Sequence, residues 1–130
     1  MNTPANLKYT KTDEWVLVEG KDATIGVTDF AQSQLSDVVF VEITVDVDDM
    51  VKKQAHIATI ESVKAAADVN LPVSGKVIAI NQKLADTPEQ INSDPFGAAW
   101  MVKIAISDTA ELDQLMDAKA YEEFCSTRSH

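Results

Sequence analysis

Lys64 is the residue whose surroundings point most clearly to chemistry. It follows Glu61-Ser-Val and precedes three alanines, so no other charge lies directly beside it. It also lies between two β-rich runs, which predicts a hairpin turn. A lysine at such a tip extends its stem into water, where a modifying enzyme can reach the amine. Alone, an exposed turn lysine is usually an ordinary surface residue, so the interpretation depends on the wider pattern.

A second motif, Pro72-Val-Ser-Gly75, follows the lysine, with Gly75 eleven residues beyond it. Proline and glycine favour a turn at this point. We expect Gly75 to adopt a positive φ and to turn the chain back across the sheet. The two motifs together predict a lysine-bearing hairpin followed by a sharp turn.

The chain that must position these motifs is mainly β. Short β-rich runs separated by turn residues predict strands over residues 15–18, 23–27, 38–43, 57–63, 68–71, 77–80 and 100–106. The first two are joined by Glu19-Gly-Lys-Asp22, a hairpin sequence. In the last one, apolar residues recur at every second position, which is typical of a half-buried strand. Residues 81–99 lack such a pattern and predict a long loop.

Short helices are expected after the second strand and in the C-terminal tail. Asp29 is followed three residues later by Gln32, a spacing that resembles a capping box and predicts a helix through Leu35. In the tail, Asp108 can cap a helix, and a second short helix follows. The apolar residues of these two helices are Leu112, Leu115 and Met116, which share one face, and Tyr121 and Phe124.

The composition is that of an acidic globular protein. The chain has 130 residues, 45% hydrophobic and 25% charged, which predicts a single domain over residues 1–130 with its core at about 7–125. The net charge of -10 repels nucleic acid and anionic membrane and favours basic patches on protein partners. The same charge also serves simple solubility.

Several classes of function lack their motifs. The N-terminus has neither the apolar segment of a signal peptide nor an arginine-rich presequence, and no run is long enough to span a membrane, so we expect a cytoplasmic protein. Cys125 is the only cysteine, which excludes an internal disulfide. The sequence has no phosphate-binding glycine loop, no Cys/His cluster with zinc spacing and no basic patch interleaved with aromatics. We therefore expect no metal site and no nucleic-acid partner.

The ordered set of motifs resembles the glycine cleavage system H proteins, a family of lipoyl carriers. The hallmark of that family is a Glu-Ser-Val-Lys-Ala core followed by Pro-Val-Ser-Gly, which here contain Lys64 and Gly75. The resemblance extends from Tyr9 to Phe124. Its further blocks are Asp13–Trp15, Ile25–Asp29, Asp37–Glu42, Asn81–Leu84, Ile91–Pro95, Glu111–Leu115 and Tyr121.

The resemblance implies a mainly β fold, a lipoyl/biotinyl-type β-sandwich or flattened barrel with a short internal helix and C-terminal helices. It implies lipoate attached covalently to Lys64 of a carrier that is not itself an enzyme. In this family the arm accepts an aminomethyl group from glycine on a pyridoxal-phosphate glycine decarboxylase. It passes the group to a tetrahydrofolate-dependent aminomethyltransferase and is reoxidised by dihydrolipoyl dehydrogenase. A lipoate ligase or lipoyl transferase attaches the arm.

The resemblance also assigns residues around the loaded arm. Glu14 matches a glutamate that shelters it, and Thr12 and Asp68 match neighbours in the same cleft. A carboxylate opposite a protonated amine holds that amine as an ammonium ion. Strand alternation places Thr12 and Glu14 on one side and Asp13 on the other, with the ring of Trp15 as an apolar wall. The competing interpretation of Glu14 is an exposed carboxylate on an edge strand.

Two further positions relate to attachment of the arm, and three depart from the family pattern. Glu61 and Gly75 match positions associated with recognition by the lipoylating enzyme, although Glu61 is equally consistent with an ordinary outward-facing strand residue. Asp13 replaces the usual histidine. Asp48 and Gln54 stand where the family usually has glycine, which bears on the geometry of the turns before the lysine.

Three other functions fit parts of the sequence. A biotin carrier uses the same fold and a hairpin lysine, but biotin sites place methionine on both sides of the lysine, whereas Val63 and Ala65 flank Lys64. An H-like protein that relays lipoate to other enzymes has the same sequence features as a glycine cleavage carrier. A stand-alone enzyme would depend on carboxylates, because no nucleophile–base pair is evident. The intact mass of protein made with lipoate available discriminates a lipoyl carrier from the biotin carrier and the enzyme.

Overall fold

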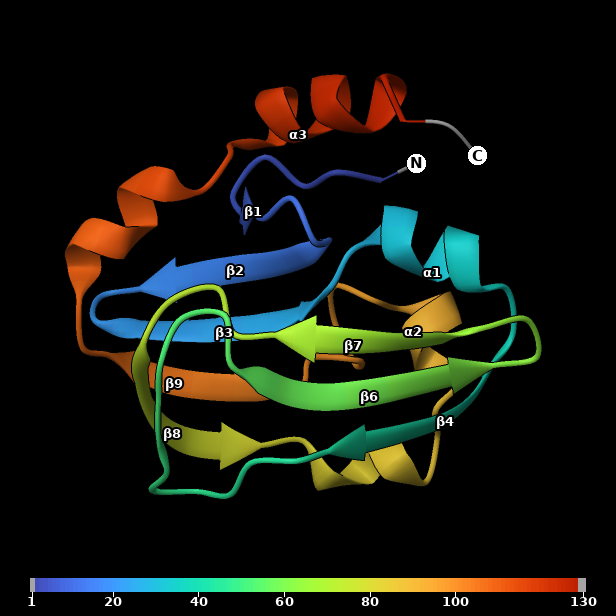
Figure 1. The fold of residues 1–130 in the computed structure, drawn as a ribbon, viewed down its shortest axis with the longest axis horizontal. Coiled ribbons are helices and arrows are strands. Elements are labelled where there is room, and N and C mark those ends of the chain that lie inside the picture. The colour runs from blue at the N-terminus through green and yellow to red at the C-terminus, as the bar shows by residue number, and fades with distance from the viewer. Residues whose placement is uncertain (1, 129–130) are drawn as a thin grey trace.

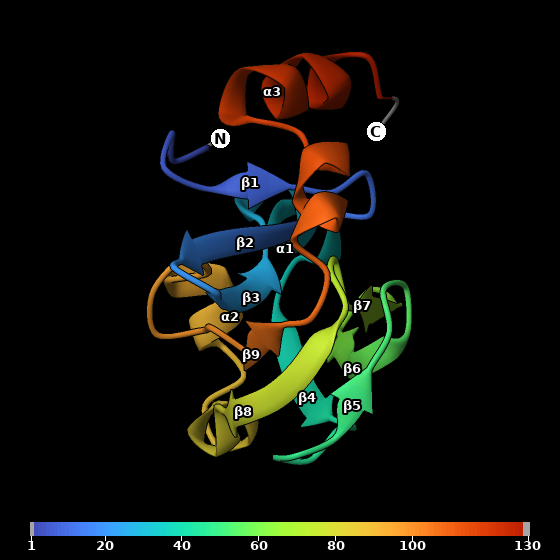
Figure 2. The same cartoon turned by 90° about the vertical axis from the view of Figure 1, so that its left-hand side faces the viewer.

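Two open β-sheets form the body of the protein (Figures 1 and 2). The computed structural model describes residues 2–128. Its strands are β1 (Lys8–Tyr9), β2 (Glu14–Glu19), β3 (Asp22–Val27), β4 (Val38–Ile43), β5 (Met50–Val51), β6 (His56–Ser62), β7 (Ala66–Asn70), β8 (Gly75–Ile80) and β9 (Val102–Ile106). The six-stranded sheet has the order β1-β2-β3-β9-β8-β5 and the three-stranded sheet has the order β4-β6-β7. The predicted mainly β sandwich is confirmed.

Short helices lie at the turns and at the C-terminus. They are α1 (Asp29–Leu35), α2 (Gln90–Ser93) and α3 (Ala118–Ser126), with 3₁₀ helices η1 (Gln82–Ala85) and η2 (Thr109–Gln114). Figure 1 shows α3 above the N-terminal segment and β1, on the side of the molecule away from β4. The two ends of the chain therefore pack on each other beside the start of β2.

The interior between the sheets follows the predicted alternation from Val102 onward, where β9 begins. Before it the alternation is wrong, because Met101 is buried and Trp100 is only half-buried. Val102, Ile104 and Ile106 of β9 are buried, and the two residues between them are only half-buried. Ile60 of β6 and Val69 of β7 contribute buried side chains from the other sheet. Burying one such aliphatic side chain stabilises the fold by about 1.5–3 kcal/mol, so this layer holds the two sheets together.

A second apolar cluster anchors α3. Tyr9 and Tyr121 stack with ring centroids 4.7 Å apart, and Cys125 is buried in the same cluster. The hydroxyl of Tyr121 lies 2.6 Å from that of Thr28, at the start of α1. The C-terminal helix is thus tied to both the N-terminal strands and α1.

The prediction of a long loop over residues 81–99 is wrong, because this segment contains η1 and α2. Leu84 and Ile91 anchor the two short helices in the core. The side-chain amide of Asn81 donates to the carbonyl oxygens of Ala98 at 2.9 Å and Trp100 at 2.8 Å, which closes the segment on itself. Leu84 and Ile91 are the only large aliphatic residues in this segment, and two such residues in nineteen are too sparse to show helical periodicity.

The predicted capping box at the start of α1 is displaced by one residue. The N-cap is Thr28, whose hydroxyl accepts a hydrogen bond from the amide of Ala31. Asp29 is the first helical residue and accepts from the side-chain amide of Gln32 at 2.6 Å. The helix ends at Leu35 as predicted.

The tail differs from the prediction at Met116. Asp108 caps the first helix as expected, by accepting from the amide of Ala110, but that helix is 3₁₀. Met116 lies beyond it and exchanges backbone hydrogen bonds with Tyr9, each at 2.8 Å. Met116 therefore pairs with the N-terminal strand and does not share the helical face with Leu112 and Leu115 that the sequence predicted.

Four residues other than glycine have a positive φ, among residues 2–128. They are Asp13, Ser36, Asp48 and Gln54, with φ values of 73°, 62°, 78° and 76°. Asp48 and Gln54 are the two positions where the resemblance implies glycine, and both adopt the left-handed conformation that glycine adopts most readily. Ser36 combines its φ of 62° with a ψ of -146°, a region almost confined to glycine.

We expect Ser36→Gly to raise the free energy of unfolding by about 1–2 kcal/mol, because it relieves this backbone strain at an exposed position. The carbonyl oxygen of Ser36, which accepts from Asn92 at 2.7 Å, is kept. Ser36→Ala retains the strain and is the control. Chemical denaturation checks the difference, and a glycine variant no more stable than the alanine variant contradicts it.

Candidate functional site

Lys64 lies in the turn between β6 and β7, and residues 63–65 are all exposed. Ser62 orders this turn: its hydroxyl oxygen accepts from the amide of Lys64 at 3.2 Å and from that of Ala65 at 3.0 Å, and it donates to the carbonyl oxygen of Ala65. The amide of Val63 donates to the carbonyl oxygen of Asp37. The backbone is therefore fixed while the lysine stem extends outward. The predicted hairpin lysine is confirmed, although β7 begins two residues earlier than expected.

Glu61 lies near this turn on the outer face of the three-stranded sheet. It pairs in register with Phe40 on one side and Ala66 on the other, and its side chain is exposed. Phe40 is 44% exposed, so an apolar ring lies beside the carboxylate. A protein that approaches Lys64 from this side meets both side chains.

Glu14 is buried, with only 1% of its surface exposed, so it is not an exposed edge-strand carboxylate. Its Oε1 accepts from the hydroxyls of Thr10 at 2.6 Å and Thr12 at 2.5 Å. Its Oε2 accepts from the amide of Asn70 at 3.3 Å, across from β2 to β7. Burial raises the pKa of Glu14, and the hydrogen bonds from Thr10, Thr12 and Asn70 oppose that rise. Three donors aimed at one carboxyl group suit its ionised form.

A cavity of about 190 Å³ lies beside Glu14, between α1 and β7. Its apolar wall includes Val27, Leu35, Ile60, Ala67 and Val69, and its polar residues include Thr12, Glu14, Asp68 and Arg128. Asp68 is exposed, and one of its oxygens lies 3.5 Å from Nε2 of His56. The structure thus places Thr12, Glu14 and Asp68 together around one apolar slot.

Strand alternation is the wrong reason for the grouping of Thr12 with Glu14. The strand β2 begins only at Glu14, and Asp13 has a φ of 73°, so residues 11–13 form a turn. This turn directs Asp13 to the C-terminal segment instead. Trp15 does not form a wall of the cavity, because its ring packs over Gly26 and its indole N–H donates to the carbonyl oxygen of Pro95.

The expected positive φ of Gly75 is wrong, because Gly20 is the glycine that has one among residues 2–128. Gly75 is buried at the start of β8. A Cβ there would lie 2.5 Å from the carbonyl oxygen of Ala105, so close packing against β9 accounts for the glycine. Figure 1 shows that β8 starts at the opposite end of the molecule from the β6–β7 turn.

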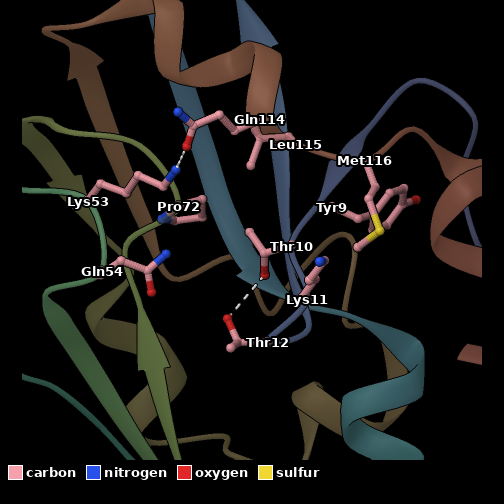
Figure 3. Close-up of a pocket in the computed structure, with 10 residues that line it drawn as sticks. All are labelled: Tyr9, Thr10, Lys11, Thr12, Lys53, Gln54, Pro72, Gln114, Leu115 and Met116. Carbon is pink, nitrogen blue, oxygen red and sulfur yellow. Dashed lines mark hydrogen bonds between the residues drawn. The ribbon is translucent and has the colours of Figure 1, made fainter. Parts of the chain in front are cut away.

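A second cavity, of about 180 Å³, is lined by Thr10 and Thr12 among other residues (Figure 3). Lys53 reaches into it and donates a hydrogen bond to the side-chain oxygen of Gln114. Gln54, one of the residues with positive φ, lines the same cavity. Lys53 is therefore held against the body of the protein and is not displayed at a hairpin tip as Lys64 is.

Sequence reasoning missed three residues around Glu14. Thr10 and Asn70 donate to its carboxylate, and Arg128 lines the same cavity. Asn70 is 56 residues away in sequence, and Arg128 lies at the far end of the chain. The only available signal was the pair of threonines at residues 10 and 12, because a threonine hydroxyl can donate a hydrogen bond to a nearby carboxylate.

The sandwich with a lysine on an ordered hairpin defines a lipoyl/biotinyl-type domain. Residues 7–128 match the family model described as glycine cleavage H-protein, and the chain belongs to that family. The glycine cleavage system H protein of Thermotoga maritima is 55% identical over 119 residues, which cover 92% of this chain and 95% of the relative. That of Symbiobacterium thermophilum is 49% identical over 123 residues, 95% of each chain.

A solved structure shows the same fold. The crystal structure of a glycine cleavage system H protein from Mycobacterium marinum superposes with a TM-score of 0.85 at 28% identity. The match covers 95% of this chain and 98% of the other. Within residues 2–128, no helix is long and apolar enough to cross a membrane, and no group of three or more His, Cys, Asp and Glu could hold a metal ion.

Proposed function

We propose that this chain carries lipoic acid on Lys64 and serves as the lipoyl-bearing shuttle of glycine cleavage. The observation that carries this proposal is the pairing of an exposed lysine on an ordered turn with an apolar cavity that contains a buried carboxylate. The names of the relatives, which are components of the glycine cleavage system, agree with it.

The residues present fit a lipoyl arm. Ala67 lines the cavity and lies three residues from Lys64 along the chain, a span of roughly 10 Å in an extended strand. An arm on Lys64 can therefore fold back over β7 to reach the slot. The wall of aliphatic side chains suits an alkyl chain with sulfur, and Glu14 supplies one anion for a carried amine.

The lipoyl group supplies a disulfide that can be reduced and can carry a one-carbon amine from the decarboxylase to the aminomethyltransferase. The protein supplies the rest: Lys64 tethers, the cavity excludes water, and Glu14 holds a proton on the amine nitrogen, with Thr12 and Asp68 at its side. The chain itself is a carrier without a catalytic group. Dihydrolipoyl dehydrogenase and a lipoate ligase or lipoyl transferase complete its partners.

Glu61 and Gly75 take different parts in attachment of the arm. Glu61 is exposed beside the hairpin and can contact the lipoylating enzyme directly. Gly75 is buried and far from the turn, so its effect on lipoylation passes through the stability of the sheet.

We expect one lipoyl group on Lys64 and on no other lysine, after incubation with lipoate, ATP and a lipoate ligase. Peptide mass mapping measures it. Lys64→Arg keeps the charge, removes the acceptor and should abolish the added mass. Lys53, which bonds to Gln114, and Lys76, whose Nζ lies 3.5 Å from Asp48, are internal controls. Biotin on Lys64, or lipoate on Lys53 or Lys76, contradicts the proposal.

A further inference from the structure

The end of the chain is clamped to the turn that precedes Glu14. Arg128 donates two hydrogen bonds to Asp13, from Nη1 to Oδ1 at 2.6 Å and from Nη2 to Oδ2 at 2.8 Å. Two parallel N–H···O bonds of this kind are the strongest geometry available to an ion pair. The side chains are only 27% and 14% exposed, so solvent screens the pair less than it screens a surface pair.

Both partners are fixed by further contacts. The guanidinium carbon of Arg128 lies 4.2 Å from the ring centre of Phe30 and 4.9 Å from that of Phe124, so the cation is held between two aromatic rings. Oδ1 of Asp13 also accepts from the hydroxyl of Tyr121 at 2.8 Å. Phe30 belongs to α1, and Phe124 and Tyr121 belong to α3, so three parts of the fold meet at this ion pair.

The pair lies directly beside Glu14. Asp13 is its neighbour in sequence, and Asp13 and Arg128 both line the cavity that contains its carboxylate. The remaining charged group on this cavity is Asp68, which faces His56. The negative charge of Asp13 is one cause of the raised pKa of Glu14, after burial. An unpaired Asp13 would therefore oppose the ionised form of Glu14.

We propose that Arg128 is a positioning residue for Glu14: it neutralises Asp13 from the end of the C-terminal segment and keeps the neighbouring carboxylate seated and ionised. The Asp13–Arg128 pair then adds no net charge to the cleft. The consequence for a carried amine rests on the proposed function, whereas the effect on Glu14 itself does not.

The test is a carboxyl-carbon NMR titration of Glu14 in lipoate-free protein, with three variants. Arg128→Gln leaves Asp13 unpaired, so the pKa of Glu14 should rise above its wild-type value. Asp13→Asn removes the anion, and asparagine tolerates the positive φ, so the pKa of Glu14 should fall. The double variant should titrate close to wild type, because both charges are gone together. Arg128→Lys should shift the pKa of Glu14 less than Arg128→Gln does.

The decisive result is that the pKa of Glu14 shifts in opposite directions in Arg128→Gln and Asp13→Asn. A merely structural clamp is broken in either variant, so it would move the pKa of Glu14 in the same direction in both, or in neither. That outcome overturns the proposal. If Arg128→Gln fails to fold, Asp13→Asn and Arg128→Lys still show in which direction each change shifts the pKa of Glu14. Since no lipoate is present, a negative result here differs from a failure of Lys64 to accept lipoate.

Discussion

We expect Glu14→Gln to leave lipoylation of Lys64 unchanged and to shorten the lifetime of the loaded protein several-fold, up to about tenfold. The variant keeps the shape of the side chain and removes its charge. A protonated amine has no lone pair with which to expel a neighbouring thiolate, and a carboxylate within hydrogen-bonding distance favours that protonated state. A difference of about 1.4 kcal/mol in this interaction is a factor of ten in rate. Formaldehyde released from the loaded protein measures the lifetime.

The substitution should not unfold the protein. A glutamine can direct its carbonyl oxygen to the amide of Asn70 and its NH₂ group to the hydroxyls of Thr10 and Thr12, which accept as well as donate. Because burial raises the folded-state pKa of Glu14 above its ordinary value of 4.5, the ionised form costs stability. Wild type should therefore lose stability relative to Glu14→Gln as the pH rises from 4.5 through the folded-state pKa.

Glu61→Gln is the matched control for the lifetime. Glu61 is an exposed glutamate near Lys64 that does not line the cavity, so its neutralisation should leave formaldehyde release at the wild-type rate. Equal lifetimes for Glu14→Gln and wild type would show that Glu14 has no part in protecting the carried group. If Glu14→Gln and Glu61→Gln shortened the lifetime equally, the cause would be a long-range effect of net charge.

We expect Gly75→Ala to lower the free energy of unfolding by about 3 kcal/mol. The new Cβ would lie 2.5 Å from the backbone oxygen of Ala105 and 3.0 Å from Cδ1 of Ile104, so β8 and β9 must separate locally. Overpacking of this kind costs roughly 1–3 kcal/mol in a well-packed core, and here one contact is with rigid backbone. Denaturant unfolding measures the loss.

Gly20→Ala is the control for backbone conformation. Gly20 has a φ of 65°, and a Cβ there meets nothing within 4 Å, so only the strain of a left-handed alanine remains, about 1 kcal/mol.

Lipoylation of Gly75→Ala should be normal at a temperature where the variant is fully folded. A folded Gly75→Ala protein that cannot be lipoylated would instead make Gly75 part of the surface read by the lipoylating enzyme.

The sequence was sufficient for the features that depend on local patterns. Val102, Ile104 and Ile106 alternate because a half-buried strand has a period of two. The β2–β3 hairpin, the helix ending at Leu35 and the turn at Lys64 each follow from a few consecutive residues. The position of Lys64 on an exposed turn could be predicted because the turn lies between two consecutive β-rich runs.

The predictions that were wrong, and the residues that were missed, concern contacts between distant segments. Gly75 is a glycine because of Ala105, thirty residues further on, and not because of its own φ. Met116 leaves its expected helical face because Tyr9 offers a strand edge. The residue pattern within one segment does not show which distant segment will pack against it. The sequence pattern therefore could not predict these contacts.

The amino-acid sequence by itself determined the sandwich and the lysine on its hairpin. Only the tertiary structure decided the character of Glu14. Its burial, its hydrogen bond from Asn70 and its neighbouring Asp13–Arg128 pair come from segments separated by 56 and 115 residues. The pKa of a carboxyl group is set by the solvent and charges within a few ångströms, and the folded chain supplies both from across the sequence.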